Sequence, residues 1–374
     1  MKFMFACGGT AGHIYPAISV ADRLREKYPD AEFLFVGVEG NMETELVPRE
    51  GYPIKTLVVS GLRRSMKPAN ILYNIRSLYR TECATMKAKK IIKEFGPDAV
   101  LGTGGYVCYP VIRAARALGV PTLIHESNAY PGLTTKMLEK YADRIMVGFE
   151  ESRSYYKQPE KIFVTGTPVR GGFISMSKAE AKRELGYTDE KPLVLSFWGS
   201  LGASRMNEYT AEIIAMNEKE GAFRHIHATG GGDEGAARMA ELLKKAGVGE
   251  LKHTEVRPFI YNMPILMAAA DVVMCRSGAS TIAELTATGT PTLQVPSKNV
   301  TANHQEKNAR VLEKQGGAIV ITEAECSAEK IYSELCRCAN DSARLSAMSR
   351  AMLEMGRPDA VESITEAVLS LVKK

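Results

Sequence analysis

The fold is decided by Ala6-Cys7-Gly8-Gly9-Thr10-Ala11-Gly12-His13. An apolar run from Phe3 to Ala6 leads into this stretch, and apolar residues then recur at helical spacing from Ile14 to Leu24. A strand, a glycine turn and a helix in this order direct backbone N–H groups and a helix N-terminus at an anion. Glycine permits the close approach because a Cβ would stand in the way. A tight turn with a purely structural histidine is the plainer interpretation, and it stays open.

Strands and helices alternate along almost all of the 374 residues, which predicts α/β domains with parallel sheets covered on both faces. A break at Thr167–Gly172, with a proline and paired glycines, predicts a linker between an N-terminal domain (residues 1–166) and a C-terminal domain (residues 167–374). We expect two Rossmann-like, doubly wound units with a ligand cleft, and a last helix that packs back on the N-terminal domain. Strands are expected at 2–7, 32–36, 54–58, 99–102, 122–125, 144–147, 162–165, 192–197, 224–228, 252–256, 271–275, 292–295 and 318–321.

Composition restricts the class of protein. Hydrophobic residues make up 45% and charged residues 24%, which is typical of globular domains, and no apolar run reaches the roughly 18–20 residues that span a bilayer. The seven cysteines lack C-x-x-C spacing and predict reduced thiols. No signal-peptide pattern precedes the first expected strand, so we expect a cytoplasmic protein. The histidines form no metal-ligand pattern, and no Asp-x-Asp motif is evident in a suitable loop. We therefore expect no metal and no cofactor.

Charge is distributed unevenly. Residues 1–170 carry a formal charge of +7 and the remainder −2, so the first half favours an acidic partner: nucleic acid, a phosphate-bearing substrate or an anionic membrane. The basic residues concentrate along an expected helix within Pro68–Phe95. A stripe that faces the core is the commoner interpretation of its apolar face, and an element that contacts anionic lipid is the functional one. This apolar face comprises Ile71, Leu72, Ile75, Leu78 and Tyr79.

Two further polar turns follow expected strands of the first half. Gly102-Thr103-Gly104-Gly105-Tyr106 is a second glycine turn, and His125-Glu126-Ser127-Asn128 is a polar cluster. In a doubly wound sheet both lie at the same carboxyl edge as the first turn. Two adjacent glycine turns can hold a diphosphate. Glu126 can serve as a general base or as an acceptor for a diol, and a structural pair with His125 is the alternative.

The second half offers its own phosphate turns. Gly199-Ser200-Leu201-Gly202-Ala203 opens it with a hydroxyl beside helix N–H groups, and Arg170 can add a charge-assisted contact. Cys275-Arg276-Ser277-Gly278-Ala279-Ser280-Thr281-Ile282-Ala283-Glu284 is the densest stretch. Its Glu284 can accept two hydrogen bonds from a ribose, or merely complement the helix dipole. Gln305 can donate to and accept from a sugar.

In their order, these motifs resemble the MurG family of peptidoglycan glycosyltransferases over essentially the whole chain. The resemblance implies a GT-B fold, with two Rossmann-like domains that face a cleft. It implies an inverting transfer of N-acetylglucosamine from UDP-N-acetylglucosamine to undecaprenyl-pyrophosphoryl-N-acetylmuramoyl-pentapeptide (lipid I to lipid II). It further implies a peripheral protein at the cytoplasmic face of the cell membrane, on an anionic membrane surface, with no nucleic-acid partner. The motifs are Gly8–His13, Gly104–Tyr106, His125–Asn128, Gly166–Arg170, Cys275–Glu284 and Gln305.

The resemblance also assigns residues. His13 is the first choice for the general base, because a histidine in this turn can take up the acceptor's proton, and Glu126 is the second. The acceptor diphosphate is assigned to Gly9, Gly104, Gly105 and Tyr106. Contacts with UDP-N-acetylglucosamine are assigned to Thr10, Ala11, Gly12, Asn128, Arg170, Ser200, Ile260, Ala279, Ser280, Thr281, Ile282, Ala283, Glu284 and Gln305.

Two positions depart from the family pattern. Ala11 replaces a glycine, which is compatible with the turn only if its φ is negative, and Trp198 replaces the first glycine of the turn before Ser200. Two other functions remain open. A UDP-N-acetylglucosamine 2-epimerase would form product without a lipid acceptor, and a nucleotide-sugar-binding protein would bind UDP without turnover.

Overall fold

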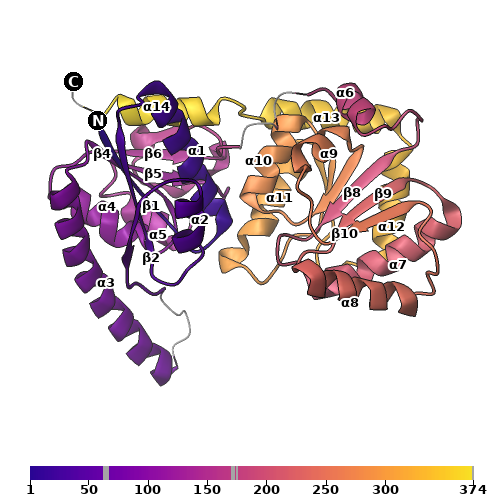
Figure 1. The fold of residues 1–374 in the computed structure, drawn as a ribbon, viewed down its shortest axis with the longest axis horizontal. Helices are drawn as coiled ribbons and strands as arrows, with labels where there is room; N and C mark the ends of the chain where they lie inside the picture. The colour runs from indigo at the N-terminus through magenta and orange to yellow at the C-terminus, as the bar shows by residue number, and fades with distance from the viewer. Residues whose placement is uncertain (62–66, 170–172, 174–175, 373–374) are drawn as a thin grey trace. The chain divides into compact units, whose positions relative to one another are not determined.

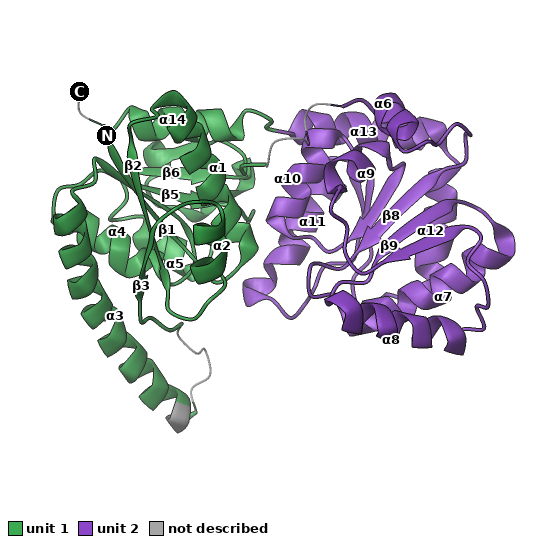
Figure 2. Ribbon diagram, viewed as in Figure 1, with its two compact units in different colours: residues 1–170, 357–374 green, residues 171–356 purple. Residues whose placement is uncertain are grey.

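The computed structural model describes residues 1–61, 67–169, 173 and 176–372. The chain divides into two compact units, which are described separately (Figure 2). Unit 1 comprises residues 1–170 and 357–374, and unit 2 comprises residues 171–356. Each unit is a parallel sheet with helices on both faces, so the two Rossmann-like domains expected from the alternating pattern are confirmed (Figure 1).

Unit 1 holds a seven-stranded sheet in the order β3-β2-β1-β4-β5-β6-β7, with every neighbouring pair parallel. Its first strand has five consecutive buried residues, as a strand covered on both faces requires. The strands lie within a few residues of the expected ranges. They are β1 (Lys2–Cys7), β2 (Glu32–Val38), β3 (Ile54–Leu57), β4 (Ala99–Gly104), β5 (Thr122–Glu126), β6 (Arg144–Val147) and β7 (Ile162–Val164).

Two hydrophobic clusters cover the two faces of this sheet. One includes Ile92 and Val111 from α3 and α4, and the other includes Ile14 from α1 and Ile364 from α14. Helix α14 therefore returns from the end of the chain to unit 1, where Glu362 pairs with Arg23 at 2.7 Å. The helices of unit 1 are α1 (Ala11–Lys27), α2 (Glu43–Arg49), α3 (Pro68–Phe95), α4 (Cys108–Ala117), α5 (Leu133–Leu138) and α14 (Ala360–Leu369), with 3₁₀ turns at Glu150–Tyr155 and Pro159–Lys161.

Unit 2 holds a six-stranded parallel sheet in the order β10-β9-β8-β11-β12-β13. Its strands are β8 (Leu193–Phe197), β9 (Arg224–Ala228), β10 (Thr254–Arg257), β11 (Val272–Cys275), β12 (Thr292–Gln294) and β13 (Ala318–Val320). Its helices are α6 (Lys178–Glu184), α7 (Ser204–Glu220), α8 (Gly232–Lys245), α9 (Met263–Ala269), α10 (Ala279–Thr288), α11 (His304–Lys314), α12 (Ala328–Ala339) and α13 (Ser342–Met355), with a 3₁₀ turn at Thr301–Asn303.

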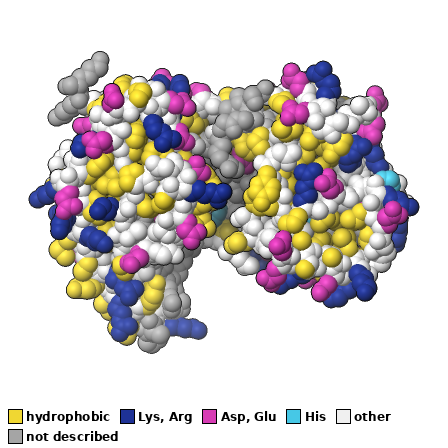
Figure 3. All heavy atoms as spheres, in the orientation of Figure 1, with side chains coloured by type: hydrophobic (Ala, Val, Ile, Leu, Met, Phe, Trp, Pro, Cys, Tyr) yellow, Lys and Arg dark blue, Asp and Glu magenta, His cyan; other side chains and the backbone are white. Residues whose placement is uncertain are grey.

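Helix α3 corrects one expectation. The apolar face of its amino-terminal half does not face the core: Leu72, Ile75 and Leu78 are 53%, 58% and 55% exposed, and Ile71 and Tyr79 are exposed as well. Only the carboxyl-terminal half, with the buried Ala84, Ala88 and Ile92 among others, packs on the sheet. The helix is longer than the sheet that it covers, so its first turns extend beyond the body of unit 1 (Figure 1). Hydrophobic and basic side chains lie together on that extension (Figure 3).

Candidate functional site

His13 lies in the first turn of α1, directly after the first glycine turn. Its Nδ1 is 3.0 Å from the Gly8 carbonyl oxygen and 3.3 Å from Thr10 Oγ1. A carbonyl oxygen can only accept, so Nδ1 carries the proton and Nε2 holds the lone pair. The His13 carbonyl in turn accepts a 2.7 Å hydrogen bond from Thr103 Oγ1, which anchors the backbone at this position. The arrangement presents a partly exposed imidazole in the tautomer of a base.

The first two glycine turns interlock. The Gly8 N–H donates to the Gly104 carbonyl at 3.2 Å. A Cβ on Gly104 would lie 2.3 Å from His13 Cδ2, and a Cβ on Gly105 would lie 2.4 Å from the Gly8 oxygen. Both residues also have positive φ, +132° and +89°. The second turn thus needs glycine because the His13 ring and the first turn pack directly against it.

Glu43 is a site residue that sequence reasoning missed. It is fully buried at the start of α2, and its carboxylate accepts hydrogen bonds from Val38 N at 2.8 Å and Gly9 N at 3.1 Å. A Cβ on Gly8 would lie 2.3 Å from Glu43 Oε1, so the missing side chain makes room for this carboxylate. The N–H of Gly9 is therefore engaged by the protein itself. The sequence signal was weak, because α2 has only seven residues and contains Pro48.

Glu126 ends β5 and is only 6% exposed. Its Oε1 accepts from Asn128 N at 3.0 Å and Asn128 Nδ2 at 2.9 Å, and its Oε2 accepts from Gly132 N and Thr135 Oγ1 at 2.8 Å each. Four hydrogen-bond donors thus converge on this one carboxylate. His125 bonds elsewhere, to the Gly166 carbonyl at 2.9 Å, and burial lowers its pKa. The carboxylate of Glu126 therefore organises the loop from Asn128 to Thr135.

The remaining expected residues of unit 1 frame the same edge. Thr10, Ala11 and Gly12 form the start of α1. Ala302 and Asn303 are the only non-glycine residues with positive φ in the described part of the chain, so Ala11 has the negative φ that its methyl group requires. Tyr106 is 56% exposed. Arg170 lies outside the described residues.

The carboxyl edge of the unit 2 sheet is built around α10. Gly278 precedes this helix, and Glu284 lies in its second turn. The side chain of Ile282 is buried, and its backbone N–H donates to the Gly278 carbonyl at 2.9 Å, which closes the first turn of the helix. In the described structure the buried hydroxyl of Ser277 has no hydrogen-bond partner, directly before the helix. The expected residues Ala279, Ser280, Thr281, Ile282 and Ala283 begin α10.

Another glycine turn, at residues 230–232 of unit 2, was not expected from the sequence, and it supports the Ser200 turn. Gly230, Gly231 and Gly232 all have positive φ, and Gly231 N donates to the Ser200 carbonyl at 3.0 Å. A Cβ on Gly230 would lie 2.3 Å from Gly202 N. Three consecutive glycines after an expected strand were the available signal.

Three other residues of unit 2 complete this edge. Ile260 is 4% exposed after β10, and the Gln305 side-chain oxygen accepts from Ser297 N at 2.9 Å. Arg276 pairs with Glu323 at 2.8 Å and donates to the Val295 carbonyl at 2.9 Å. Its guanidinium lies 5.9 Å from the centre of the Trp198 ring.

Trp198 replaces a family glycine without blocking the turn. Its indole is 3% exposed in the hydrophobic core of unit 2, where Nε1 donates to Thr210 Oγ1 at 2.9 Å. The adjacent Gly199 has a φ of +89° and no atom within 4 Å of an added Cβ. The large side chain therefore points inward while the turn stays open at the next residue.

Cysteines near these edges are not nucleophiles. Burial raises the pKa of Cys108 and of Cys275 to about 12, and it raises the pKa of Cys7 as well. A thiol with so high a pKa carries almost no reactive thiolate near neutral pH.

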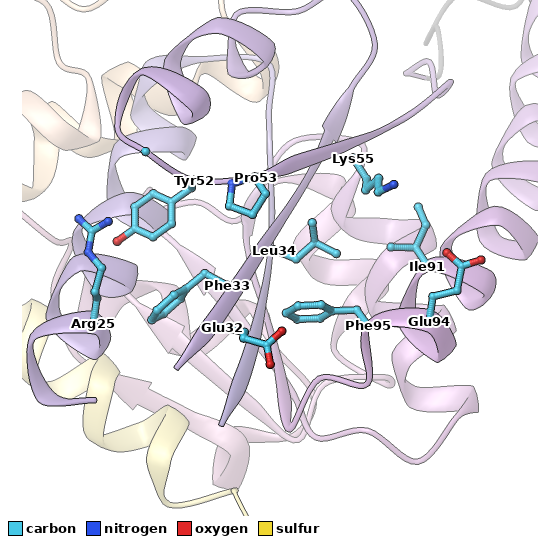
Figure 4. A pocket seen from close by; sticks show the side chains of 11 residues that line it. Arg25, Glu32, Phe33, Leu34, Tyr52, Pro53, Lys55, Ile91, Glu94 and Phe95 are labelled. Atoms are coloured by element: carbon cyan, nitrogen blue, oxygen red, sulfur yellow. The ribbon is translucent and has the colours of Figure 1, made fainter. Parts of the chain in front are cut away.

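A hollow of about 610 Å³ lies away from these turns, at the amino ends of β2 and β3 (Figure 4). Tyr52 and Phe33 lie on one side of the strands, and Phe95 and Ile91 on the other. None of the expected site residues lines this hollow. It therefore lies outside the candidate site.

Comparisons with known proteins agree with the two sheets. Residues 3–147 match the Glycosyltransferase family 28 N-terminal domain, and residues 193–364 match the Glycosyltransferase family 28 C-terminal domain. A UDP-N-acetylglucosamine–N-acetylmuramyl-(pentapeptide) pyrophosphoryl-undecaprenol N-acetylglucosamine transferase from Acetivibrio thermocellus is 40% identical over 373 residues, covering 100% of this chain and 99% of that protein.

Solved structures resemble the whole chain too. The crystal structure of Acinetobacter baumannii MurG has a TM-score of 0.79 and 25% identity, with 99% of each chain covered. A UDP-GlcNAc 2-epimerase from Neisseria meningitidis, bound to UDP-GlcNAc, has a TM-score of 0.67 and 14% identity, with 99% of this chain and 100% of that chain covered. At that identity the epimerase shares the fold alone.

Proposed function

Because the chain belongs to the family of UDP-N-acetylglucosamine–N-acetylmuramyl-(pentapeptide) pyrophosphoryl-undecaprenol N-acetylglucosamine transferases, we propose that it catalyses the transfer in that name. It is a hexosyltransferase that moves N-acetylglucosamine from UDP-N-acetylglucosamine to the lipid-linked N-acetylmuramyl-pentapeptide. The observation that carries this conclusion is 40% identity along the whole chain. The product is a lipid-linked disaccharide for peptidoglycan synthesis.

The chemistry is an inverting displacement. The acceptor hydroxyl attacks the anomeric carbon of the sugar, and UDP leaves in line on the opposite side. His13 Nε2 takes the hydroxyl proton, because Nδ1 already donates to the Gly8 carbonyl. Glu126, with four donors on its carboxylate, holds the loop that carries Asn128 rather than accepting a proton.

Substrate binding is divided between the units. The acceptor diphosphate lies against Gly104, Gly105 and Tyr106 of unit 1. Gly9 lines the same surface without donating to the diphosphate, because its N–H is hydrogen-bonded to Glu43. The donor is held by unit 2. Negative charge that develops on the leaving diphosphate is stabilised by Ser200, by Arg170 and by the N-terminus of α10.

Glu284 and Gln305 hold the ribose and the sugar of the donor. The backbone of Ile260 meets the uracil. In unit 1, Thr10, Ala11, Gly12 and Asn128 complete the surface for the sugar.

Helix α3 is the membrane contact. Leu72, Ile75 and Leu78 are more than half exposed, and Arg76 and Arg80 are exposed between and beside them. Such a face inserts apolar side chains at the level of the lipid headgroups while its cations meet anionic phosphates. Among the described residues no helix is long and apolar enough to cross a membrane. The exposed apolar and basic side chains of α3 support a peripheral position at an anionic membrane surface, and the family resemblance supports its cytoplasmic face.

One incubation tests the reaction. Radiolabelled UDP-N-acetylglucosamine is supplied with and without the lipid-linked acceptor, and label is counted in the lipid phase and in free sugars. Label should enter the lipid phase only when acceptor is present. Epimerised free sugar without acceptor would establish the epimerase, and UDP binding without any turnover would establish a binding protein; either result refutes the transferase.

A further inference from the structure

The buried carboxylate of Glu43 is not explained by the assignments above. It comes from α2, which follows β2, and it is 0% exposed. In the part of the chain that is described, no ion pair neutralises it, and its recorded partners are two backbone N–H groups, those of Val38 and Gly9. A buried charge is costly unless its partners are well placed. Its position therefore calls for a reason beyond packing.

The peptide bond between Gly8 and Gly9 links this carboxylate to His13. The N–H of that peptide donates to Glu43 Oε2 at 3.1 Å, and its C=O accepts from His13 Nδ1 at 3.0 Å. In a trans peptide the N–H and C=O lie in the peptide plane and point in opposite directions, so the carboxylate and the imidazole bond to opposite edges of one rigid planar unit. The three groups form a continuous chain of hydrogen bonds.

We propose that Glu43 is a positioning residue for His13, acting across the Gly8–Gly9 peptide; this rests on the proposed role of His13 as the base. The negative carboxylate polarises the peptide, which makes the Gly8 oxygen a stronger acceptor for Nδ1–H. The imidazole is thereby held in the tautomer whose Nε2 is free for the acceptor hydroxyl. Glu43 itself touches neither substrate.

The chain makes room for this contact at two places. A Cβ on Gly8 would lie 2.3 Å from Glu43 Oε1, and a Cβ on Gly37 would lie 2.5 Å from its Cγ. Gly9 has a φ of +87° and open space around an added Cβ, so its conformation, and not crowding, requires glycine. The need to accommodate the Glu43 carboxylate therefore explains these glycines as well as the binding of a phosphate does.

The experiment compares Glu43→Gln with Glu45→Gln, which removes the same charge from an exposed position of the same helix. The two N–H groups bond to different oxygens of the carboxylate, so a glutamine in the same position would present its NH2 group, which is a donor, to one of them. We expect Glu43→Gln to lower kcat about tenfold while KM for UDP-N-acetylglucosamine changes less than about twofold, as for other residues that orient a reacting ligand. Glu45→Gln should match the wild type. Equal kcat values for the two variants overturn the proposal.

A second measurement does not depend on activity, and its wild-type part does not depend on the folding of a variant. Nitrogen-15 NMR of histidine-labelled wild-type protein, assigned with His13→Gln, reports which ring nitrogen of His13 carries the proton. We expect Nδ1–H in the wild type and a mixture of tautomers in Glu43→Gln. An Nε2–H tautomer in the wild type overturns the proposal. If the tautomers behave as expected but the wild type transfers no sugar to the lipid acceptor, the positioning contact stands and the proposed function fails.

Discussion

Acid should destabilise unit 2 well above the pH at which carboxylates titrate. His225 and His227 of β9 are fully buried, and each bonds to the hydroxyl of Ser196 at 2.8 Å. Their other ring nitrogens have no partner among the described residues. Burial lowers the pKa of both rings from 6.5 to about 3. Both are thus neutral in the folded state, while the unfolded chain binds protons below pH 6.5.

The sign and size of the effect follow from proton linkage. The pKa of each histidine is lower in the folded state than in the unfolded chain. The free energy of unfolding is therefore at its full value above pH 6.5 and decreases progressively as the pH falls toward 3. Between pH 7 and pH 5 each histidine costs about 2 kcal/mol, so the pair costs about 4 kcal/mol. That is a large part of the roughly 5–15 kcal/mol that stabilises a typical domain. Asp271, whose pKa is lowered mainly by Lys178 and Lys182 against the cost of burial, acts only at lower pH.

The assay uses the one tryptophan of the chain, Trp198, which is buried in unit 2. Urea unfolding followed by its fluorescence at pH 7, 6 and 5 gives the free energy of unfolding of that unit. A His225→Gln, His227→Gln double variant should lose most of the pH dependence, whereas His304→Gln, near the surface at the start of α11, should keep it. A wild-type change below about 1 kcal/mol between pH 7 and 5, or an equal slope in the double variant, would refute the reasoning.

Three further changes test the site and the membrane contact. Gly104→Ala places a Cβ 2.3 Å from the His13 ring and should lower kcat about a hundredfold, measured at saturating donor and acceptor. Arg276→Met leaves Glu323, whose side chain is only 12% exposed, without its cation and should lower the free energy of unfolding by about 3 kcal/mol, measured by urea titration. Leu78→Asp should weaken binding to phosphatidylglycerol vesicles about tenfold in a sedimentation assay, while Leu353→Asp, equally exposed in unit 2, should not.

Much of the fold could be predicted because parallel strands buried on both faces leave a clear apolar pattern. The first strand, Lys2–Cys7, was expected at its observed limits, and the glycine turns mark the carboxyl edge of each sheet. Short elements were missed for the opposite reason. Helices α2 and α6 were not expected because they bury almost no apolar side chain, Val47 in one and Ala181 in the other, so no apolar face marks them.

The limits of prediction at the site are limits of range. Gly8 and His13 are neighbours in sequence, but Glu43 bonds to Gly9 across 34 positions, and no local pattern announces such a pair. The orientation of the α3 face could not be decided either, because periodicity identifies an apolar face without showing what covers it. The apolar face of α3 is exposed because the first turns of the helix extend beyond the sheet, and a sequence pattern does not show the length of the sheet.

The glycine turns of the two units are alike in sequence but differ in what occupies them. In unit 1 the N–H of the Gly8–Gly9 peptide is hydrogen-bonded to Glu43 and its C=O to His13. This turn therefore acts as a rigid support for an imidazole. In unit 2 the corresponding turn bonds instead to backbone N–H groups of other glycines, Gly202 N to the Gly199 carbonyl and Gly231 N to the Ser200 carbonyl at 3.0 Å each, and Leu201 at its tip is 87% exposed. A turn whose backbone groups already bond to side chains of the protein is suited to hold a reacting side chain in place. A turn with an exposed tip is suited to contact the phosphate of a ligand. In the function that we propose, the same strand–turn–helix unit supplies the base in one half of the chain and the donor site in the other.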